Sequence, residues 1–426
     1  MIDGSRRHKA GEEVHGLTLA HTMAAVAPQA NTTPEVVPTQ KNDVVRSRMS
    51  AGEVHQWVEA LFCDDLHAKR VLSLAHGVVG VLHAASLAIH AIGQGLAKAR
   101  GGSPKHATKQ IDRLLSNKGL VLDDILRSWL AFVVAQRQEL LVTIDWTDFD
   151  EDDQTTLAIN LITSHGRATP LLWKTHKKSR LKDCRNSYED ELLNRLHDYL
   201  PLGRKVTVLA DRGFGDQKLY ALMKEWDFDF VIRFRGVVVV EHADGTIATA
   251  AALTPGNGRA KMYKNVKVTR DRTDVNAVVC VKAPGMKDAW HLATSRADLS
   301  ATKVTKLYGR RFTTEENFRD TKDIKFGLGM SSTHIEDCER RDRLLLLAAM
   351  AEALLTLLGA ASEATGLDRQ LKVNTAKKRT HSLFRQGLYW FEAIPTMREE
   401  WLRPLMIAFG ELLLQHSFFS NTLGVI

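Results

Sequence analysis

The middle of the chain constrains the fold most, because short apolar runs and amphipathic segments alternate there in a definite order. Three strands are predicted in succession, at residues 140–149, 155–166 and 168–176. An amphipathic helix (187–200), a buried strand (205–214), a helix (216–226) and another strand (229–236) follow, each predicted from its own pattern. This order favours an α/β fold with a mixed sheet.

Residues 236–300 have a different texture from the segments on either side. Short β-prone runs are separated by turn signals such as ADG, PGNG and APG. We therefore expect a β-rich insertion between the last strand of the mixed sheet and the helices that begin near residue 300 and continue to the C-terminal end.

The segment before the sheet, 51–140, has apolar residues at helical spacing and predicts a helical domain. One of its helices begins after the GGSP break and places Lys109 and Arg113 on one side, while Ile111 and Leu114 can face inward. A basic helix face suits DNA phosphates, but a solvated helix face explains these residues equally well.

Composition sets broad limits on function. The 426 residues are too many for one compact core and predict two or three domains, and the net charge of +8 favours an acidic partner such as nucleic acid. Four widely separated cysteines form no CxxC pair, which indicates free thiols in a reducing compartment.

Residues 1–48 resemble a disordered leader, so the natural start could be Met49.

The most apolar run, Leu344–Ala361, contains Glu352 near its middle and is short for a membrane span. A buried helix is the better interpretation of this run, and no membrane partner is expected.

Two predicted strands carry aspartates where their apolar runs end. Asp145 follows LLVTI and Asp211 follows VTVLA. Carboxylates at such a sheet edge can hold divalent cations through oxygen, and a third would complete a site for phosphodiester chemistry. Taken singly, each Asp could also be an ordinary turn residue. Asp148 lies three positions along the first strand and should face away from Asp145.

The segment LYGRRFTTEENFRDTKD, residues 307–323, could supply the third carboxylate. On a continuous helix, Tyr308, Arg311, Glu315 and Lys322 would form one narrow stripe. Glu315 could then bind metal while its three neighbours bind phosphates, and Glu316 would point elsewhere.

These residues resemble a known family. The pattern Y-x2-R-x3-E-x6-K is the YREK signature of DDE transposases from bacterial insertion sequences of the "insertion sequence four" group, and it is complete here. Asp145 in TIDWTD and Asp211 in LADRGF resemble the family's two aspartates. The predicted strand order matches the RNase H-like fold of these enzymes, and the long separation of Asp211 from Glu315 accommodates the β insertion that this group places there.

The segments described above give a domain plan for the whole chain, of which the resemblance covers roughly residues 50–400. It comprises a leader (1–48), a helical DNA-binding domain (49–139), the first part of the RNase H-like core (140–235), the β-rich insertion (236–300), the Glu-bearing helix of the core (301–345) and a C-terminal helical region (346–426).

The resemblance also implies a mechanism. Mg²⁺ or Mn²⁺ held by Asp145, Asp211 and Glu315 would promote cleavage at the terminal inverted repeats and strand transfer into target DNA. The protein would act as a homodimer on double-stranded DNA, in the bacterial cytoplasm at the nucleoid. Relatives form a hairpin and stack a flipped base on Trp, and Trp290 resembles that residue, although a core Trp on a strand is at least as good an interpretation.

Two other functions stay open at this point. A regulator or decayed copy would bind end DNA without cutting it, but the presence of all three carboxylates favours the enzyme. An RNase H-like nuclease would cut DNA without joining it, and simple hydrolysis needs neither the β insertion nor the Tyr308–Lys322 pattern.

Overall fold

The computed structural model describes residues 49–215 and 217–414, which belong to one compact unit spanning residues 41–426. The predicted leader and the question of a start at Met49 fall on residues 1–48, outside the described residues.

From residue 49 onward, where the structure describes the chain, five helices precede the sheet, as the spacing of apolar residues predicted. They are α2 (Ala51–Phe62), α3 (Ala68–Ala84), α4 (Ile89–Arg100), α5 (Pro104–Leu115) and α6 (Leu122–Val134). In α5, Ile111 and Leu114 are buried and Lys109 and Arg113 are exposed, as predicted. Helices α4 and α5 approach closely at Gly93, where a Cβ would lie 2.5 Å from Thr108 Cα.

The central elements occur in the predicted order. They are β1 (Glu139–Phe149), β2 (Gln154–Ile162), β3 (Ala168–Lys177), α7 (Arg185–Tyr199), β4 (Lys205–Ala210), α8 (Gln217–Glu225) and β5 (Asp229–Arg233). Strands β1, β4 and β5 pair in parallel, whereas β1–β2 and β2–β3 are antiparallel. The mixed sheet expected from sequence is therefore confirmed.

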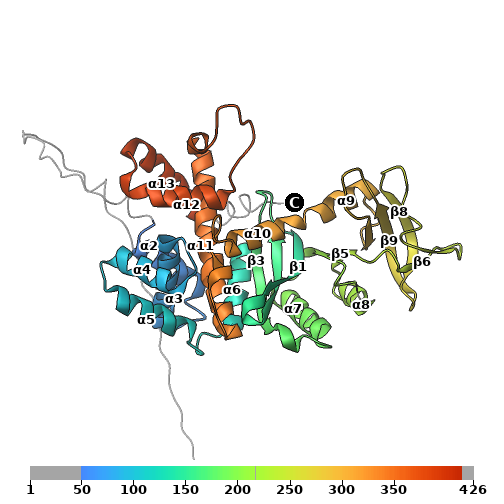
Figure 1. Cartoon of the computed structure of the whole chain (residues 1–426), viewed down its shortest axis with the longest axis horizontal. Coiled ribbons are helices and arrows are strands. Elements are labelled where there is room, and N and C mark those ends of the chain that lie inside the picture. The colour runs from blue at the N-terminus through green and yellow to red at the C-terminus, as the bar shows by residue number, and fades with distance from the viewer. Residues whose placement is uncertain (1–48, 216, 415–426) are drawn as a thin grey trace, which may run out of the picture. The chain divides into compact units, whose positions relative to one another are not determined.

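The β-rich segment continues this sheet. Its strands are β6 (Val239–Glu241), β7 (Ile247–Thr249), β8 (Lys261–Val268), β9 (Thr273–Val281) and β10 (Trp290–Thr294). Strand β10 pairs antiparallel with β5, with Leu292 opposite Arg233, and this pairing gives a ten-stranded sheet in the order β3-β2-β1-β4-β5-β10-β9-β8-β6-β7 (Figure 1). The insertion is consequently anchored to the strand that follows Asp211.

Helices return after the sheet. They are α9 (Ala301–Gly309), α10 (Phe312–Lys322), α11 (Cys338–Ala364), α12 (Leu383–Ala393) and α13 (Glu399–Leu414). Short 3₁₀ turns lie at Asp150–Asp152, Lys178–Arg180, Met330–Ser332, Leu367–Leu371 and Ile394–Thr396.

The expectation of one continuous helix over residues 307–323 is wrong. Helix α9 ends at Gly309 and α10 begins at Phe312. Between them the backbone tightens into i→i−3 hydrogen bonds, from Arg311 N to Tyr308 O (2.9 Å) and from Thr314 N to Arg311 O (3.0 Å). The break is slight, because Arg310 and Arg311 keep right-handed helical backbone angles. The Tyr308 side chain, before the break, still lies close enough to Arg311 to interact with it.

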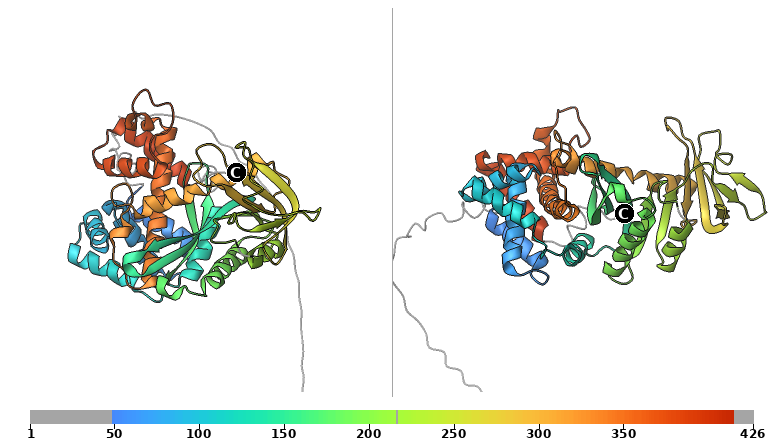
Figure 2. Two further views of the ribbon diagram at one scale, coloured as in Figure 1. Left: turned by 45° about the vertical axis from the view of Figure 1, so that its right-hand side comes forward. Right: turned by 60° about the horizontal axis from the view of Figure 1, so that its bottom comes forward.

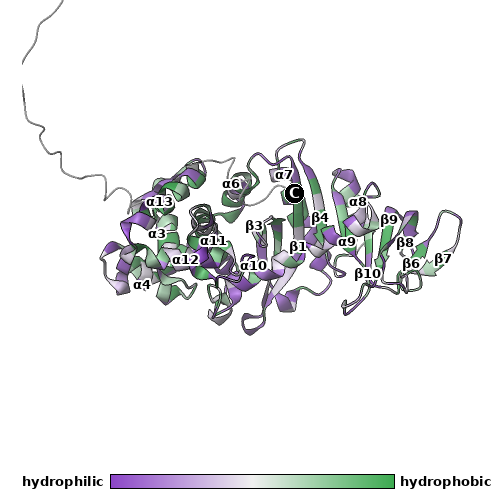
Figure 3. Cartoon of the chain, turned by 90° about the horizontal axis from the view of Figure 1, so that it is seen from above, coloured by the Kyte–Doolittle hydropathy of each residue, from purple (hydrophilic) through white to green (hydrophobic). Residues whose placement is uncertain are grey.

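Helix α11 is a core element, as predicted for its apolar run. It is long and apolar enough to cross a membrane, but 89% of its most apolar window is buried inside the protein. It contacts α3 and β3, and Figure 2 shows it between the N-terminal helices and the sheet. The residues of α11 are mostly hydrophobic, whereas α10 is mostly hydrophilic, as the colouring of Figure 3 shows for α10. The expected domain boundary at residues 345 and 346 falls inside this single helix.

Candidate active site

The two aspartates lie side by side because their strands are parallel neighbours. Ile144 of β1 pairs with Ala210 of β4, so Asp145 and Asp211 follow directly on a matched pair. Strand β1 continues beyond Asp145 to Phe149, whereas β4 ends at Ala210. Both carboxylates therefore occupy the edge of the sheet where α/β proteins usually bind ligands.

Alternation along β1 then decides which helix each side chain meets. Side chains of Thr143 and Thr147 lie on the same face as Asp145. The Thr143 hydroxyl shares a buried hydrogen bond of 2.7 Å with Thr314 Oγ1, and Lys322 Nζ donates to Thr147 Oγ1 at 3.2 Å. Helix α10 is thus fixed at both ends against the face of β1 that carries Asp145.

This attachment brings Glu315 to the aspartates. Asp145, Asp211 and Glu315 line one open cavity of about 590 Å³ together with Trp146, Thr147, Arg311, Phe318, Arg319, Lys322, Asp323 and Ser331. Of the residues that sequence analysis assigned to this site, Arg311 and Lys322 are also on the cavity wall. The structure therefore brings five of the predicted site residues together.

Arg311 bridges two of the carboxylates. Its Nη1 donates to Asp145 Oδ2 at 2.7 Å and its Nη2 donates to Glu315 Oε1 at 2.8 Å. Burial raises the pKa of Asp145 to about 6, while the Arg311 guanidinium counteracts that rise and the charge of Asp211 adds to it. The guanidinium thus supplies positive charge where acidic side chains crowd together.

The donor chemistry of the cavity suits a hard divalent cation, because three carboxylates provide oxygen ligands. The three carboxylates are not gathered around one point, because the Arg311 guanidinium lies between Asp145 and Glu315. Within residues 49–215 and 217–414, no three His, Cys, Asp or Glu side chains are close enough together to hold a metal ion. A cation shared by Asp145 and Glu315 would have to replace the Arg311 guanidinium between them.

The predicted phosphate contacts of Tyr308 and Trp290 do not lie on the cavity wall. Tyr308 is only 1% exposed and belongs to an apolar cluster with Leu141, Leu209 and Val304. Its ring meets that of half-buried Trp290 edge-on, with centroids 5.0 Å apart. Burial raises the pKa of Tyr308, and the charges of Arg311 and Asp211 also act on it. Tyr308 therefore lies behind the cavity wall, next to two residues that line it.

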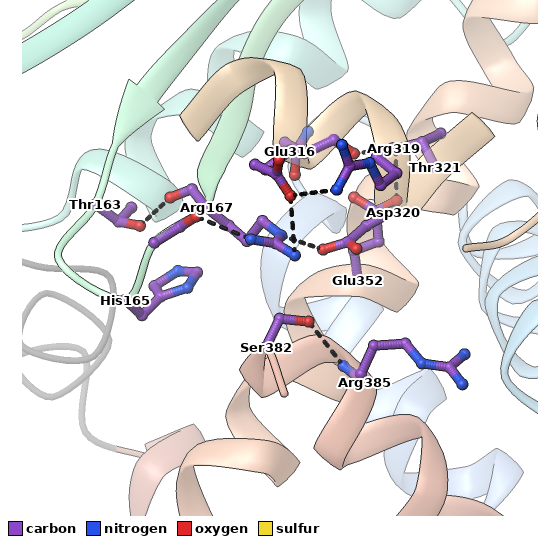
Figure 4. A network of polar contacts seen from close by, with 12 residues as sticks. Thr163, His165, Arg167, Glu316, Arg319, Asp320, Thr321, Glu352, Ser382 and Arg385 are labelled. Carbon is purple, nitrogen blue, oxygen red and sulfur yellow. Dashed lines mark hydrogen bonds and ion pairs between the residues drawn. The ribbon is translucent and has the colours of Figure 1, made fainter. Parts of the chain in front are cut away.

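The back of α10 is held by a polar network that sequence reasoning missed (Figure 4). Arg167, from the turn between β2 and β3, donates Nε to Asp320 Oδ2 at 2.6 Å. Thr321 donates its hydroxyl to Glu352 Oε1 of α11 at 2.6 Å, and burial raises the pKa of Glu352 to about 8. No local pattern identifies these partners, because they are far apart in sequence.

Three further residues beside the cavity were also missed. Trp146 is on the cavity wall, and its indole Nε1 donates to Glu189 Oε1 of α7 at 2.7 Å. Arg185 lies over the Trp146 ring at 5.1 Å and pairs with Glu189 at 3.2 Å. Burial raises the pKa of Glu189 to about 7. Strand alternation next to Asp145 was the one signal that could have drawn attention to Trp146.

Comparison with protein families adds independent information. Residues 179–351 match the family model described as Transposase DDE domain. The match supports a DDE transposase. The matched transposase segment contains Asp211, Arg311 and Glu315, whereas Asp145 precedes it. A search of curated proteins found no match to the chain.

The fold agrees with this family. A mixed sheet of ten strands with helices is an α/β fold consistent with an RNase H-like transposase domain. The family also implies DNA as the substrate. Lys109 and Arg113 are exposed on α5 and available to solvent, but they are not on the wall of the acidic cavity.

Proposed function

We propose that this protein is a cut-and-paste DNA transposase of the "insertion sequence four" group, with the YREK residues at Tyr308, Arg311, Glu315 and Lys322. The observation that carries the proposal is one cavity that Asp145 shares with Asp211 and Glu315, the latter two lying inside the matched transposase segment. Its reaction is cleavage at the inverted repeats followed by transfer of the freed strand into target DNA.

The acidic residues would act as metal ligands in this reaction. Bound by Asp145, Asp211 and Glu315, Mg²⁺ or Mn²⁺ supplies activation of the attacking oxygen and stabilisation of the leaving oxygen. Arg311, freed from the carboxylates, can donate to a phosphate oxygen in their place. Lys322 is already held at the rim by the Asp148 carbonyl, to which its Nζ donates at 2.6 Å.

The remaining assignments concern DNA and assembly. Lys109 and Arg113 of α5 would contact phosphates of the element ends. Trp290 would stack on a displaced base near the cut, and Tyr308 would contact a phosphate there. The active form would be a homodimer holding two ends, at work in the bacterial cytoplasm on the nucleoid.

The test uses purified protein, Mg²⁺ and labelled DNA ends taken from the sequence that flanks its gene, resolved on a denaturing gel. Wild type should nick these ends, and Glu315→Gln should bind them without cutting. Asp148→Asn is the matched control, because the Asp148 side chain pairs with Lys178 (2.7 Å) outside the cavity and its loss should leave cutting intact. Cutting by Glu315→Gln, or no cutting by wild type, would contradict the proposal.

The same gel separates the alternatives. End binding by wild type without any cutting in Mg²⁺ or Mn²⁺ would indicate a regulator or decayed copy. Cutting without hairpins or joined products, when target DNA is supplied, would indicate a nuclease that lacks strand transfer.

A further inference from the structure

A basic side chain that the YREK pattern does not include, Arg185, lies beside the cavity without being one of the residues that line it. Asp145 and Trp146 are consecutive on β1 and so project from opposite faces of the sheet. Asp145 meets Arg311 on the face covered by α10, and Trp146 meets Glu189 on the face covered by α7. Figure 1 shows these two helices on different sides of β1. Arg185, at the start of α7, therefore approaches the carboxylates from the side opposite to Arg311.

Gly213 shows how close this approach is. Its backbone N donates to Asp211 Oδ1 at 2.7 Å. A Cβ at Gly213 would lie 3.0 Å from that same oxygen and 4.0 Å from Arg185 Nη2. The guanidinium thus ends beside the loop that presents Asp211, and the absence of a side chain at Gly213 leaves the space between them open.

The Arg185 side chain is held in place before any ligand arrives. Its Nε pairs with Glu189 Oε1, and its plane is supported by the Trp146 ring. Glu189 is itself buried and fixed by the Trp146 indole. A guanidinium positioned in this way loses little side-chain entropy when it binds an anion.

An ion pair with Glu189 that only stabilises the fold does not account for the two terminal nitrogens of Arg185. The side chain is 46% exposed, and in the part of the chain that the structure describes its two terminal nitrogens have no hydrogen-bonded partner. Arg343 shows what a structural arginine looks like in this protein. Its side chain is 5% exposed, its Nη1 donates to the Leu115 carbonyl at 3.0 Å, and its Nη2 donates to Glu339 at 2.8 Å.

We propose that Arg185 binds a DNA phosphate at the active site, across the sheet edge from Arg311. Two arginines on opposite faces would then hold the backbone of the reacting strand over the carboxylates, and both could donate to non-bridging oxygens as negative charge develops there. This proposal rests on the proposed function, because it takes DNA as the ligand of the acidic cavity.

The experiment measures cleavage and binding separately for wild type, Arg185→Ala and Arg185→Lys. Arg195→Ala is the matched control, because Arg195 lies on the same helix and pairs with Asp123 and Glu191 (2.6 Å), neither of which is on the cavity wall. Labelled end DNA serves as the probe. Single-turnover cleavage is followed in Mg²⁺, and the dissociation constant is measured without metal between about 50 and 200 mM KCl, where phosphate contacts are strongly salt-dependent.

Arg185→Ala should slow cleavage by roughly tenfold to a hundredfold, the range expected for one charge-assisted contact. It should also reduce the slope of log Kd against log salt by roughly 0.7 to 0.9, the value for one lost phosphate contact. Arg185→Lys should keep the wild-type slope while restoring cleavage only in part, and Arg195→Ala should match wild type in both measurements.

An unchanged rate and slope in Arg185→Ala, with wild type active, would overturn the proposal while leaving the transposase function intact. If wild type binds ends but does not cut them, the salt slope alone decides the role of Arg185. Failure of wild type to bind end DNA would refute the proposed function and this proposal with it.

Discussion

Replacement of Arg311 by alanine is the sharpest test of the site geometry, because it needs neither DNA nor metal. The guanidinium pairs with Asp145 at 2.7 Å, and the two side chains are only 10% and 16% exposed. Removing it leaves the Asp145 carboxylate buried without its cation. The second pair, with Glu315, is different, because that carboxylate is 52% exposed and such pairs contribute about 1 kcal/mol or less.

The magnitude follows from burial. Breaking a buried ion pair by removing one partner costs about 3–5 kcal/mol, in line with a Coulomb energy of about 4 kcal/mol for charges 4 Å apart at an effective dielectric constant of 20. With an unfolding entropy of about 2 cal/mol/K per residue over a unit of this size, the melting temperature should fall by roughly 5 °C.

The sign of the pH dependence is fixed by Asp145. Its pKa of about 6 in the folded protein lies above the ordinary value of 3.8, so the stability gained by binding a proton is present at low pH and lost as the pH rises through 6. Arg311→Ala raises this pKa further. At pH 5 the Asp145 carboxyl is protonated in both proteins, so Arg311→Ala should lower the free energy of unfolding by only about 1 kcal/mol. At pH 8 the full loss for a broken buried ion pair should appear.

Melting temperatures of wild type and Arg311→Ala, taken at pH 5 and pH 8 without divalent cations, check this reasoning. Arg319→Ala is the control, because Arg319 is 59% exposed and its pair with Glu316 (3.0 Å) should contribute little at either pH. An equal loss at both pH values, or a loss at pH 8 no larger than that of Arg319→Ala, would refute the idea that Arg311 compensates a buried Asp145.

Three other predictions concern positions away from Arg311. Thr314→Val should destabilise the protein by about 1–3 kcal/mol, since it leaves the buried Thr143 hydroxyl unpaired, and adding Thr143→Val should recover much of the loss in a denaturation experiment. Glu352→Gln should gain stability relative to wild type as the pH rises from 6 to 9, because the raised pKa of about 8 means that wild type loses its favourable protonated form across that range; parallel melting curves at all pH values would argue against it. Lys109→Ala and Arg113→Ala should each weaken binding to end DNA and lower its salt slope by roughly one contact, and unchanged affinity would remove α5 from the DNA interface.

Local patterns were sufficient for the order of elements and for the acidic residues. Each strand and helix of the central sheet is indicated by periodicity within its own segment, and parallel strands necessarily present their carboxyl ends at one edge. For that reason the mixed sheet, the core position of α11 and the proximity of Asp145 to Asp211 could be predicted from the amino-acid sequence alone.

Local patterns thus identify which residues this protein has available for chemistry and on which elements they lie. Tertiary structure decided which of them share the cavity. Packing against Leu141, Leu209 and Trp290 buries Tyr308, and the pairing of β10 with β5 joins the insertion to the central sheet. Arg185 lies beside the loop that follows Asp211 because α7 packs against β2 and β3 and its Glu189 binds the Trp146 indole of β1. These outcomes depend on contacts between distant segments, whose burial and register no short stretch of sequence specifies.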